Sequence, residues 1–553
     1  MVSPLALNFK MMTMHSSNKI LPLLLCLLLV TGCKKGWLDV NYNPRDLTST
    51  DATPDLILAP LLERAIAVQE TRFLQHWMGY WAYYHFPSGH ALQTYDRTQI
   101  DGDSFSGEVA PEIAFLETRS RDLRMTFYTG IAKVLRVLAF QRAVDVVNSM
   151  PYKDAFISTI LQPRYDDGLT IYEDLMRQLD EATTLIKGAK LGDNIKISVA
   201  DIMFHGEQAK WIKFINTIKL RLLIHQANRT DRAAYITAEI AKIKNEGSGF
   251  LESGQDASVN PGYIINKKLS YYFGSFSSHN QYGGGDYNPL MQMGSREWAH
   301  ANVFAMNLLK QNNDPRQELF YSTIDIPVPS GAPEPFPQPG RQDLRGNKVG
   351  LYVNSGAFPY QDGAYISSVG GSRNSDIVKP EARGIIKGRD MADWVMTSIE
   401  SKFLQAEAIQ RGWLPGIAEE AYKDAVKESF RWLNAGGNAT APALSDAIFD
   451  TWYNAEVTAG NVNVSWAAAP DKYKLLMFQK YMAFNGIEPL ESWTDYRRNG
   501  RYPDVPISID PARVGNTLPF RLLYNSNEYI VNAANVNAVG PVNIFTSKIW
   551  WMP

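Results

Sequence analysis

The chain has 553 residues, of which 45% are hydrophobic and 20% charged, as in ordinary globular proteins of several units or one continuous array. A net charge of −2 and a pI of about 6.5 exclude a strongly basic surface, so we expect no nucleic acid as a partner. The cysteines are Cys26 and Cys33, both close to the N-terminus, so we expect no disulfide in the body of the protein.

The N-terminal region carries the most specific short motif. Residues 20–30 form an apolar run that is too short to span a bilayer, which needs about 20 apolar residues. The run suits the hydrophobic part of a secretory signal. It ends in the letters VTGC, in which two small residues precede Cys33, and this pattern resembles a bacterial lipobox. We therefore expect Cys33 to be lipidated; the alternative is a plain secreted signal that happens to contain a cysteine.

This motif divides the chain into three parts. We predict a signal peptide over 1–32, a lipidated tether over 33–54 and a single domain over 55–553. A signal peptide begins close to its charged flank, so Met14 is the expected start and residues 1–13 would be a mis-called extension. The tether is rich in Asn, Asp, Pro and Thr, which disfavour regular structure.

Apolar residues recur at helical spacing through the N-terminal half of the domain. Loops are expected at 86–112 and at 250–295, where Gly, Ser, Asn and Tyr dominate. Thr170 and Glu173 have the spacing of a capping box, and Asp166-Asp167 just before them also have the character of caps. The predicted helices cover residues 55–84, 120–147, 169–187, 200–229 and 232–245.

The C-terminal half repeats this organisation after a long interruption. Residues 322–390 are rich in Pro and Gly, and a loop of this length is normally functional or disordered. The tail from Val505 has no regular period, and Trp551 near its end is expected to belong to the scaffold. The predicted helices cover residues 298–310, 397–411, 416–433, 445–453 and 472–484.

Three pairs of consecutive predicted helices are similar in length. They are 120–148 with 169–187, 200–229 with 232–246, and 397–411 with 416–433. Such pairs predict an all-α protein, an α-α superhelix of tetratricopeptide-like repeats with little β structure. The loop-rich insertions at 250–295 and 322–390 would then form a ligand face supported by this scaffold.

A family resemblance rests on motifs that occur in order over nearly the whole chain. After the lipobox come TPDLILAPLLERA, PYKDAF, PRYDDGLTIYEDL and FHGEQAKWIKFINTIKLRLL. They are followed by NNDPR, SKFLQAEAIQRGW, QKYMAFNGIEPLESWTDYRRNGRYP and PFRLLYNSNEYIVNAANVNAV, and finally by KIWWMP. Together these motifs resemble the SusD/RagB family of outer-membrane nutrient-binding lipoproteins, in its SusD-like branch. Glu207 stands where the family usually has Asp, which keeps the carboxylate.

The resemblance implies a fold, a location and partners. The fold would consist of tetratricopeptide-like units that support a loop-rich ligand face. The protein would be held in the outer membrane by its lipid anchor and exposed at the cell surface. Lys34-Lys35 occupies positions where exported lipoproteins of such bacteria often carry acidic residues, so the inner face of the outer membrane is kept as an alternative location. The partners would be a TonB-dependent, SusC-like transporter and an oligosaccharide or peptide.

Motifs for catalysis or metal binding are weak. The sequence contains no HExxH, no GxSxG and no phosphate-binding loop. His85 and His90 lie in a Pro/Gly-rich loop, and Asp101-Gly102-Asp103 has Phe105 where a calcium loop needs an oxygen ligand. We therefore predict no catalytic residue, no metal and no cofactor.

Aromatic residues in the loops are the better functional signal. Sugars present flat C–H faces that pack on aromatic rings, while polar side chains bond their hydroxyls. Trp77 and Trp81 are four residues apart on one predicted helix, so one of them is expected to pack in the core. The loop tyrosines could instead pack the loops or contact the transporter. The candidate ligand-binding residues are Trp81, Tyr84, Tyr95, Tyr271, Tyr272, Tyr282, Tyr287 and Tyr360.

These observations favour a lipid-anchored binding protein that captures an oligosaccharide or a peptide and delivers it to the transporter. Two alternatives belong to other classes. A surface glycoside hydrolase, or another hydrolase, would need two carboxylates about 5–10 Å apart at the ligand face. A purely structural transporter lid would bind neither glycans nor peptides.

Overall fold

The N-terminal helices differ from the prediction where the chain turns. The first predicted helix, 55–84, ends at Ala67 in α2 (Pro54–Ala67), and Leu74–Trp77 form the separate short helix α3. The loop predicted at 86–112 is wrong, because it contains α4 (Ala91–Thr94) and the N-terminal part of α5 (Ser104–Asp122).

Burial explains why α5 forms in a stretch that looks like a loop. Pro111 lies inside this helix, yet Ile113, Leu116 and Ser120 on its inner face are fully buried. Tertiary packing against α6 (Thr126–Val147) overrides the low helix propensity of the segment. Arg124 adopts a left-handed conformation, with φ 57°, and this turn divides the predicted helix 120–147 into the end of α5 and α6.

The structure, a computed structural model, is mostly helical. Residues Thr53–Pro553 form one compact unit. Most later predicted helices are present close to their predicted positions, although α9 begins several residues after its predicted start; they are α7 (Gly168–Lys187), α9 (Gln208–His225), α10 (Ala233–Glu246), α12 (Val303–Gln311), α15 (Ser398–Gln410), α16 (Ala418–Trp432), α17 (Leu444–Thr458) and α18 (Lys472–Ala483). Further helices were not predicted; they are α8 (Ile197–Ala200), α13 (Gln317–Phe320), α19 (Pro489–Arg498), α20 (Glu528–Val531) and α21 (Ala533–Ala538), and the last two lie in the tail that was expected to be irregular. The structure describes residues 52–67, 73–82, 88–96, 104–155, 157, 159–260, 300–321, 344, 346–351, 367, 369–370, 383–385, 392–435 and 444–553.

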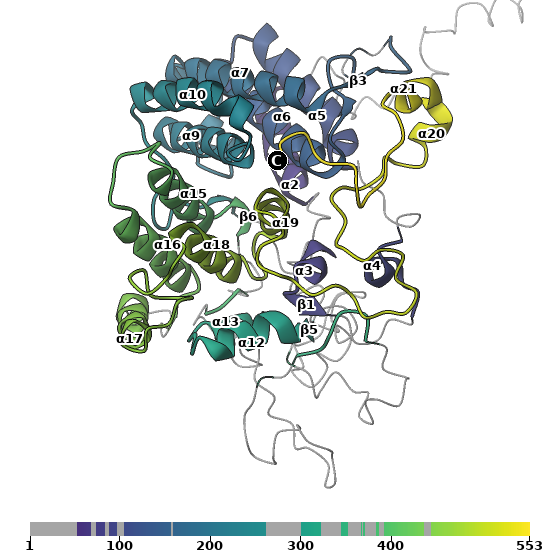
Figure 1. The fold of residues 1–553 in the computed structure, drawn as a ribbon. Helices are drawn as coiled ribbons and strands as arrows, with labels where there is room; N and C mark the ends of the chain where they lie inside the picture. Colours follow the sequence, from purple (N-terminus) through teal and green to yellow (C-terminus); the bar gives the residue numbers. More distant parts are fainter. Residues whose placement is uncertain are drawn as a thin grey trace, which may run out of the picture. The chain divides into compact units, whose positions relative to one another are not determined.

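The helices stack in a continuous series (Figure 1). In this series α5 packs on α6, α6 on α7, α7 on α9, α9 on α15 and α15 on α16, and α16 is followed by α17 and α18. Each predicted pair of neighbours is present, as α6 with α7, α9 with α10 and α15 with α16. The prediction of an all-α superhelix of paired helices is confirmed.

Strands are short in the described part of the chain, as predicted. They form two-stranded antiparallel sheets. β1 (Trp81–Ala82) pairs with β5 (His300–Ala301), and β4 (Ala257–Val259) pairs with β6 (Asp393–Met396). The third sheet joins β2 (Met150–Pro151) and β3 (Tyr165–Asp166).

Of the residues predicted to cap the helix at 169–187, one does so. Asp167 is the N-cap of α7, and its carboxylate accepts a hydrogen bond from the Leu169 N–H at 2.8 Å. Asp166 accepts from the N–H of Lys153 at 2.9 Å and so joins the strands before the helix. The capping box predicted at Thr170 and Glu173 is therefore wrong, because the helix begins three residues earlier than that motif requires.

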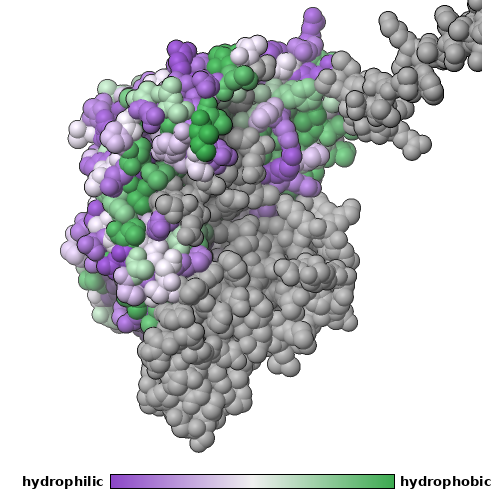
Figure 2. Space-filling model, turned by 90° about the vertical axis from the view of Figure 1, so that its right-hand side faces the viewer, coloured by the Kyte–Doolittle hydropathy of each residue, from purple (hydrophilic) through white to green (hydrophobic). Residues whose placement is uncertain are grey.

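Apolar side chains are exposed on the side of the molecule that carries α20 and α21. This side faces the viewer in Figure 2, and green residues gather in its upper part. Two segments meet there, since Gln162 Nε2 donates to the Val531 carbonyl at 3.0 Å. We call the exposed group the α20 patch; its members and their exposed fractions are Leu161 (87%), Ile530 (76%), Val531 (58%), Ile157 (46%) and Tyr529 (42%). Among the described residues, the helices are too short or too polar to cross a membrane.

Candidate ligand-binding site

Described residues that border the predicted ligand segments meet at a small sheet, β1 with β5, beside α3 and α12 (Figure 1). In this sheet Trp81 lies opposite Ala301, and Ala82 lies opposite His300. The N–H of Asn302 donates to the carbonyl of Tyr80 at 3.0 Å, which continues the pairing by one residue. Because strands of two residues have little stability of their own, other contacts must hold this sheet in place.

A buried tyrosine cluster holds this sheet against the scaffold. Tyr80 is fully buried, its ring stacks on that of Tyr481 at 4.5 Å, and its hydroxyl donates to the Tyr481 carbonyl at 2.6 Å. The Tyr321 hydroxyl donates to the Tyr80 carbonyl at 2.8 Å and accepts from Asn485 Nδ2 at 2.9 Å. Burial raises the pKa of Tyr80 well above its usual value, and the pKa of Tyr321 is raised for the same reason, so both hydroxyls keep their protons.

Three stretches of sequence that carry predicted ligand residues begin or end at β5. Ala82, two residues before Tyr84, pairs with His300. His300 itself follows the stretch 261–299, which contains the four tyrosines from Tyr271 to Tyr287. The Ala301 N–H donates to the carbonyl of Ser367 at 2.9 Å, so the stretch with Tyr360 ends there as well.

Two of the predicted ligand residues lie in the interior. Trp81 is 1% exposed and packs edge-on against His76, with the ring centroids 5.8 Å apart. Tyr95 is also 1% exposed; its ring packs against Trp77, and its hydroxyl accepts from the N–H of Ser508 at 2.8 Å. Burial raises the pKa of Tyr95 to about 12. Neither ring offers an open face in this structure, and a ligand contact by either residue stays a prediction.

The other predicted residues lie outside the described residues. They are Cys33, Tyr84, Tyr271, Tyr272, Tyr282, Tyr287 and Tyr360, and their roles stay predictions. His85 and Asp101-Gly102-Asp103 lie outside as well. His90 is described, and its Nδ1 accepts from the Leu92 N–H at the start of α4.

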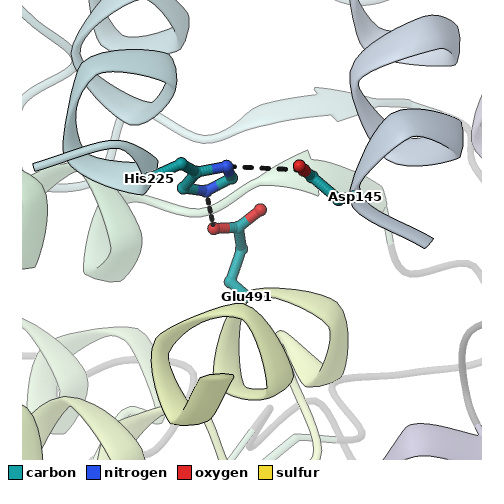
Figure 3. Close-up of side chains that lie close together, drawn as sticks. All are labelled: Asp145, His225 and Glu491. Atoms are coloured by element: carbon teal, nitrogen blue, oxygen red, sulfur yellow. Dashed lines mark hydrogen bonds and ion pairs between the residues drawn. The ribbon is translucent and has the colours of Figure 1, made fainter. Parts of the chain in front are cut away.

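A second polar cluster, which sequence reasoning missed, lies between α6, α9 and α19 (Figure 3). We call Asp145, His225 and Glu491 the His225 cluster. His225 Nε2 lies 2.8 Å from Glu491 Oε2, and Nδ1 lies 3.4 Å from Asp145 Oδ2. The three side chains are between 0% and 5% exposed. Their sequence separation hides the cluster, because nothing local connects residues 145, 225 and 491.

The electrostatics of the His225 cluster follow from burial and pairing. Burial alone lowers the pKa of His225, but the charges of Glu491 and Asp145 outweigh it and raise the pKa to about 9. Burial also raises the pKa of Glu491, while His225 and Arg221 lower it to a net value well below its usual range. The cluster is therefore an imidazolium between two carboxylates at neutral pH.

The His225 cluster is the set of described residues that could offer at least three ligand atoms to one metal ion, within 4.8 Å of one another. The remaining bonds argue against a metal. Asp145 Oδ1 accepts from Trp551 Nε1 at 2.8 Å and from the Tyr172 hydroxyl, and Oδ2 accepts from Gln141 Nε2 at 2.6 Å. A carboxylate whose oxygens already accept several hydrogen bonds has few lone pairs left to coordinate a cation. The cluster is a structural ion network.

Comparison with protein families decides the identity of the chain. The model of the SusD-like family described as "Starch-binding associating with outer membrane" matches residues 50–525. The chain belongs to the SusD-like family. No curated protein matches the chain.

Solved structures of SusD homologues have the same fold. A SusD homologue from Bacteroides fragilis has a TM-score of 0.67 at 18% identity, and the match covers 91% of this chain and 99% of that one. A SusD-like protein from Bacteroides thetaiotaomicron has a TM-score of 0.66 at 19% identity, with 90% and 98% covered. A chitin-binding protein has a TM-score of 0.65 at 20% identity, with 91% and 100% covered.

Family membership defines the class of function. SusD-like proteins bind nutrients or glycans at the outer membrane and do not catalyse a reaction. The chain is therefore a SusD-like outer-membrane binding protein and not an enzyme. Family membership therefore excludes the hydrolase alternative, and the ligand face is the candidate functional site.

Proposed function

We propose that this SusD-like protein captures an oligosaccharide, or a peptide, at the face anchored by β5 and delivers it to a TonB-dependent, SusC-like transporter. A lipid on Cys33 would hold it to the outer membrane. The observation that supports the ligand face is that Ala82, His300 and Ser367, which border the stretches with the predicted ligand tyrosines, meet at β5. Residues that are far apart in the sequence would thereby serve one site.

The chemistry of these stretches suits a carbohydrate. They are rich in tyrosine, whose ring packs on sugar C–H faces and whose hydroxyl can bond a sugar hydroxyl. The buried tyrosine cluster gives them a rigid base, and a rigid base lowers the ordering cost of binding. Modest affinity with selectivity for ligand shape is expected.

Calorimetry on the soluble chain from Gly36 onward tests this proposal. The panel would contain maltooligosaccharides, chitooligosaccharides and mixed peptides, because relatives are described as starch- and chitin-binding. Saturable binding to one class, without release of new reducing ends, is the expected result. A complete lack of binding across the panel would instead favour a structural transporter lid.

Variants locate the site once a ligand is found. Tyr84→Ala, Tyr287→Ala and Tyr360→Ala, each tested alone, are expected to weaken binding, by about tenfold where the ring is a main contact. Tyr529→Ala is the matched control, since Tyr529 is an exposed tyrosine of α20, a helix that lies far from β5 in Figure 1. Unchanged affinity in all three variants would place the ligand elsewhere.

The anchor and the transporter need separate tests. Cys33→Ala should abolish labelling with a lipid precursor and release the protein from the outer-membrane fraction. A TonB-dependent transporter should co-purify with the wild-type chain in mild detergent. Labelling that persists in Cys33→Ala would contradict the proposed anchor and leave the ligand proposal intact.

A further inference from the structure

Three turns of the helical scaffold meet and form an apolar surface distinct from the α20 patch. They are the start of α2, the turn between α5 and α6, and the segment that leads into α8. The N–H of Phe127 donates to Asn194 Oδ1 at 3.0 Å, and Lys196 Nζ lies 3.5 Å from Asp55 Oδ2. We call the exposed group the turn surface; its members and exposed fractions are Val199 (73%), Ile195 (52%), Leu191 (51%), Leu56 (48%) and Leu123 (39%).

Basic side chains surround the turn surface. Arg121, Arg124 and Lys190 are exposed, and their charged groups form no ion pair with any described residue. Lys196 is 68% exposed, and its only ion pair within the described residues is the 3.5 Å contact with Asp55. The exposed carboxylates among these turns are Asp122 and Asp193, so cations outnumber anions around the apolar side chains.

We propose that the turn surface is a docking site for an anionic lipid surface. Separate apolar side chains among exposed cations, three of the four without an ion pair to any described residue, are the pattern that binds the boundary between lipid headgroups and acyl chains. The α20 patch lacks this pattern although it is more apolar. Its neighbouring cations are paired, Arg164 with Asp154 at 2.9 Å and Lys153 with Asp166 at 3.7 Å.

The course of the chain supports a lipid surface as the occupant. The compact unit begins at Thr53, and three residues later Leu56 belongs to the turn surface. The chain before Thr53 leads to Cys33, about 20 residues away, which could span at most roughly 60–70 Å when fully extended. The predicted tether thus enters the body beside the exposed cations of the turn surface.

This inference rests on the proposed lipid-anchored function and adds a second membrane contact to it. A lipidated cysteine of a bacterial lipoprotein carries more than one acyl chain and anchors stably, so the patch is not needed for attachment itself. The patch would orient the body, because it fixes which side of the helical stack faces the lipid. A lipid anchor at the end of a tether cannot do this alone.

Vesicle binding by the chain of residues 33–553 carrying Cys33→Ala tests the inference without the anchor. The probes are vesicles of phosphatidylcholine alone and of phosphatidylcholine with about 30% phosphatidylglycerol. We expect sedimentation with the anionic vesicles only, decreasing as salt is added. Binding should fall at least about tenfold in Ile195→Asp/Val199→Asp and in Arg124→Glu/Lys190→Glu.

The matched control is Leu161→Asp/Ile530→Asp, which places the same charges on the α20 patch. All altered side chains are exposed, and thermal unfolding would confirm that each variant folds. Absence of binding to anionic vesicles, or an equal loss in the control, would overturn the inference. The glycan panel is run on the same proteins, so failure of the docking surface and failure of the proposed ligand binding give different results.

Discussion

Buried charges in this protein occur as networks with many partners. Arg221 donates two bonds to Glu400, at 2.6 and 2.7 Å, and Arg498 does the same for Glu407, at 2.7 and 2.6 Å. A buried charge costs several kcal/mol unless a partner of good geometry compensates it, so losing one member of such a pair is expensive. These pairs join residues up to 179 positions apart and hold helices in register.

The pH dependence of stability should report the state of His225. Its pKa is about 9 in the folded chain, above the ordinary value of 6.5. A raised pKa means that the folded state binds the proton more tightly than the unfolded state does. The stabilisation that protonated His225 gives the folded state is therefore complete below pH 6.5 and is lost as the pH rises through 9. We expect the free energy of unfolding to fall by about 3 kcal/mol between pH 6 and pH 9.5.

Urea unfolding at a series of pH values checks this, with His225→Gln as the control. The variant keeps a hydrogen-bonding side chain but cannot become charged, so its stability should be lower at pH 6 and should change little up to pH 9. Parallel curves for the two proteins would show that another group titrates in this window.

At the scale of elements, periodicity predicted the long amphipathic helices well. Helix α7 buries Ile171, Leu175 and Leu179, the stripe that its spacing indicates. α19 was missed because its sequence, PLESWTDYRR, is short and mostly polar, and it carries few apolar residues. All ten of its residues are nevertheless buried, and its charged side chains are satisfied by partners from other helices. Such burial depends on distant residues and leaves no local pattern.

The start of α7 offers a direct test of capping. Asp167→Ala removes the side chain that accepts from the Leu169 N–H, and the expected cost is about 1 kcal/mol. Thr170→Ala alters an exposed position inside the helix, and its effect should stay within about 0.5 kcal/mol. Chemical denaturation of the two variants compares them directly. A larger loss for Thr170→Ala would support the capping box that the sequence indicates.

The candidate site was predictable in composition but not in place. Aromatic, Gly-rich stretches marked Tyr84, Tyr271–Tyr287 and Tyr360 as ligand candidates. The meeting of their bordering residues at β5 could not be predicted, because the sheet consists of two-residue strands without a period of their own. Trp81 and Tyr95 carry the same residue types, and only the packed structure shows that they are buried.

At the scale of the whole molecule, the C-terminal segment joins the end of the chain to its first helical pairs. The Leu522 N–H donates to the Val146 carbonyl at 2.9 Å, and Arg497 Nη1 donates to the Asp145 carbonyl at 2.6 Å. Trp551 completes the connection, since its Nε1 donates to Asp145 Oδ1 at 2.8 Å. A stack of helices whose neighbours interact mainly in sequence order would otherwise unfold from its ends.

Trp551 should therefore stabilise the whole stack and not only the tail. Its ring is fully buried and lies 5.9 Å from the ring of His225. Trp551→Ala is expected to cost about 3–5 kcal/mol through the cavity and the lost hydrogen bond. Trp551→Phe keeps most of the ring and should cost less. Trp413→Ala, at a half-buried position outside this cluster, serves as the control.

Hydrogen exchange distinguishes a local effect from a global one. If the C-terminal segment closes the stack, Trp551→Ala should lower the protection of α6, α7 and α9 together with that of the tail, because Asp145 of α6 contacts His225 of α9 and accepts from the Tyr172 hydroxyl of α7. Protection lost only after residue 500 would mean that the tail unfolds alone. The helical stack would then not depend on its C-terminus, and the bonds to Asp145 would serve the tail itself.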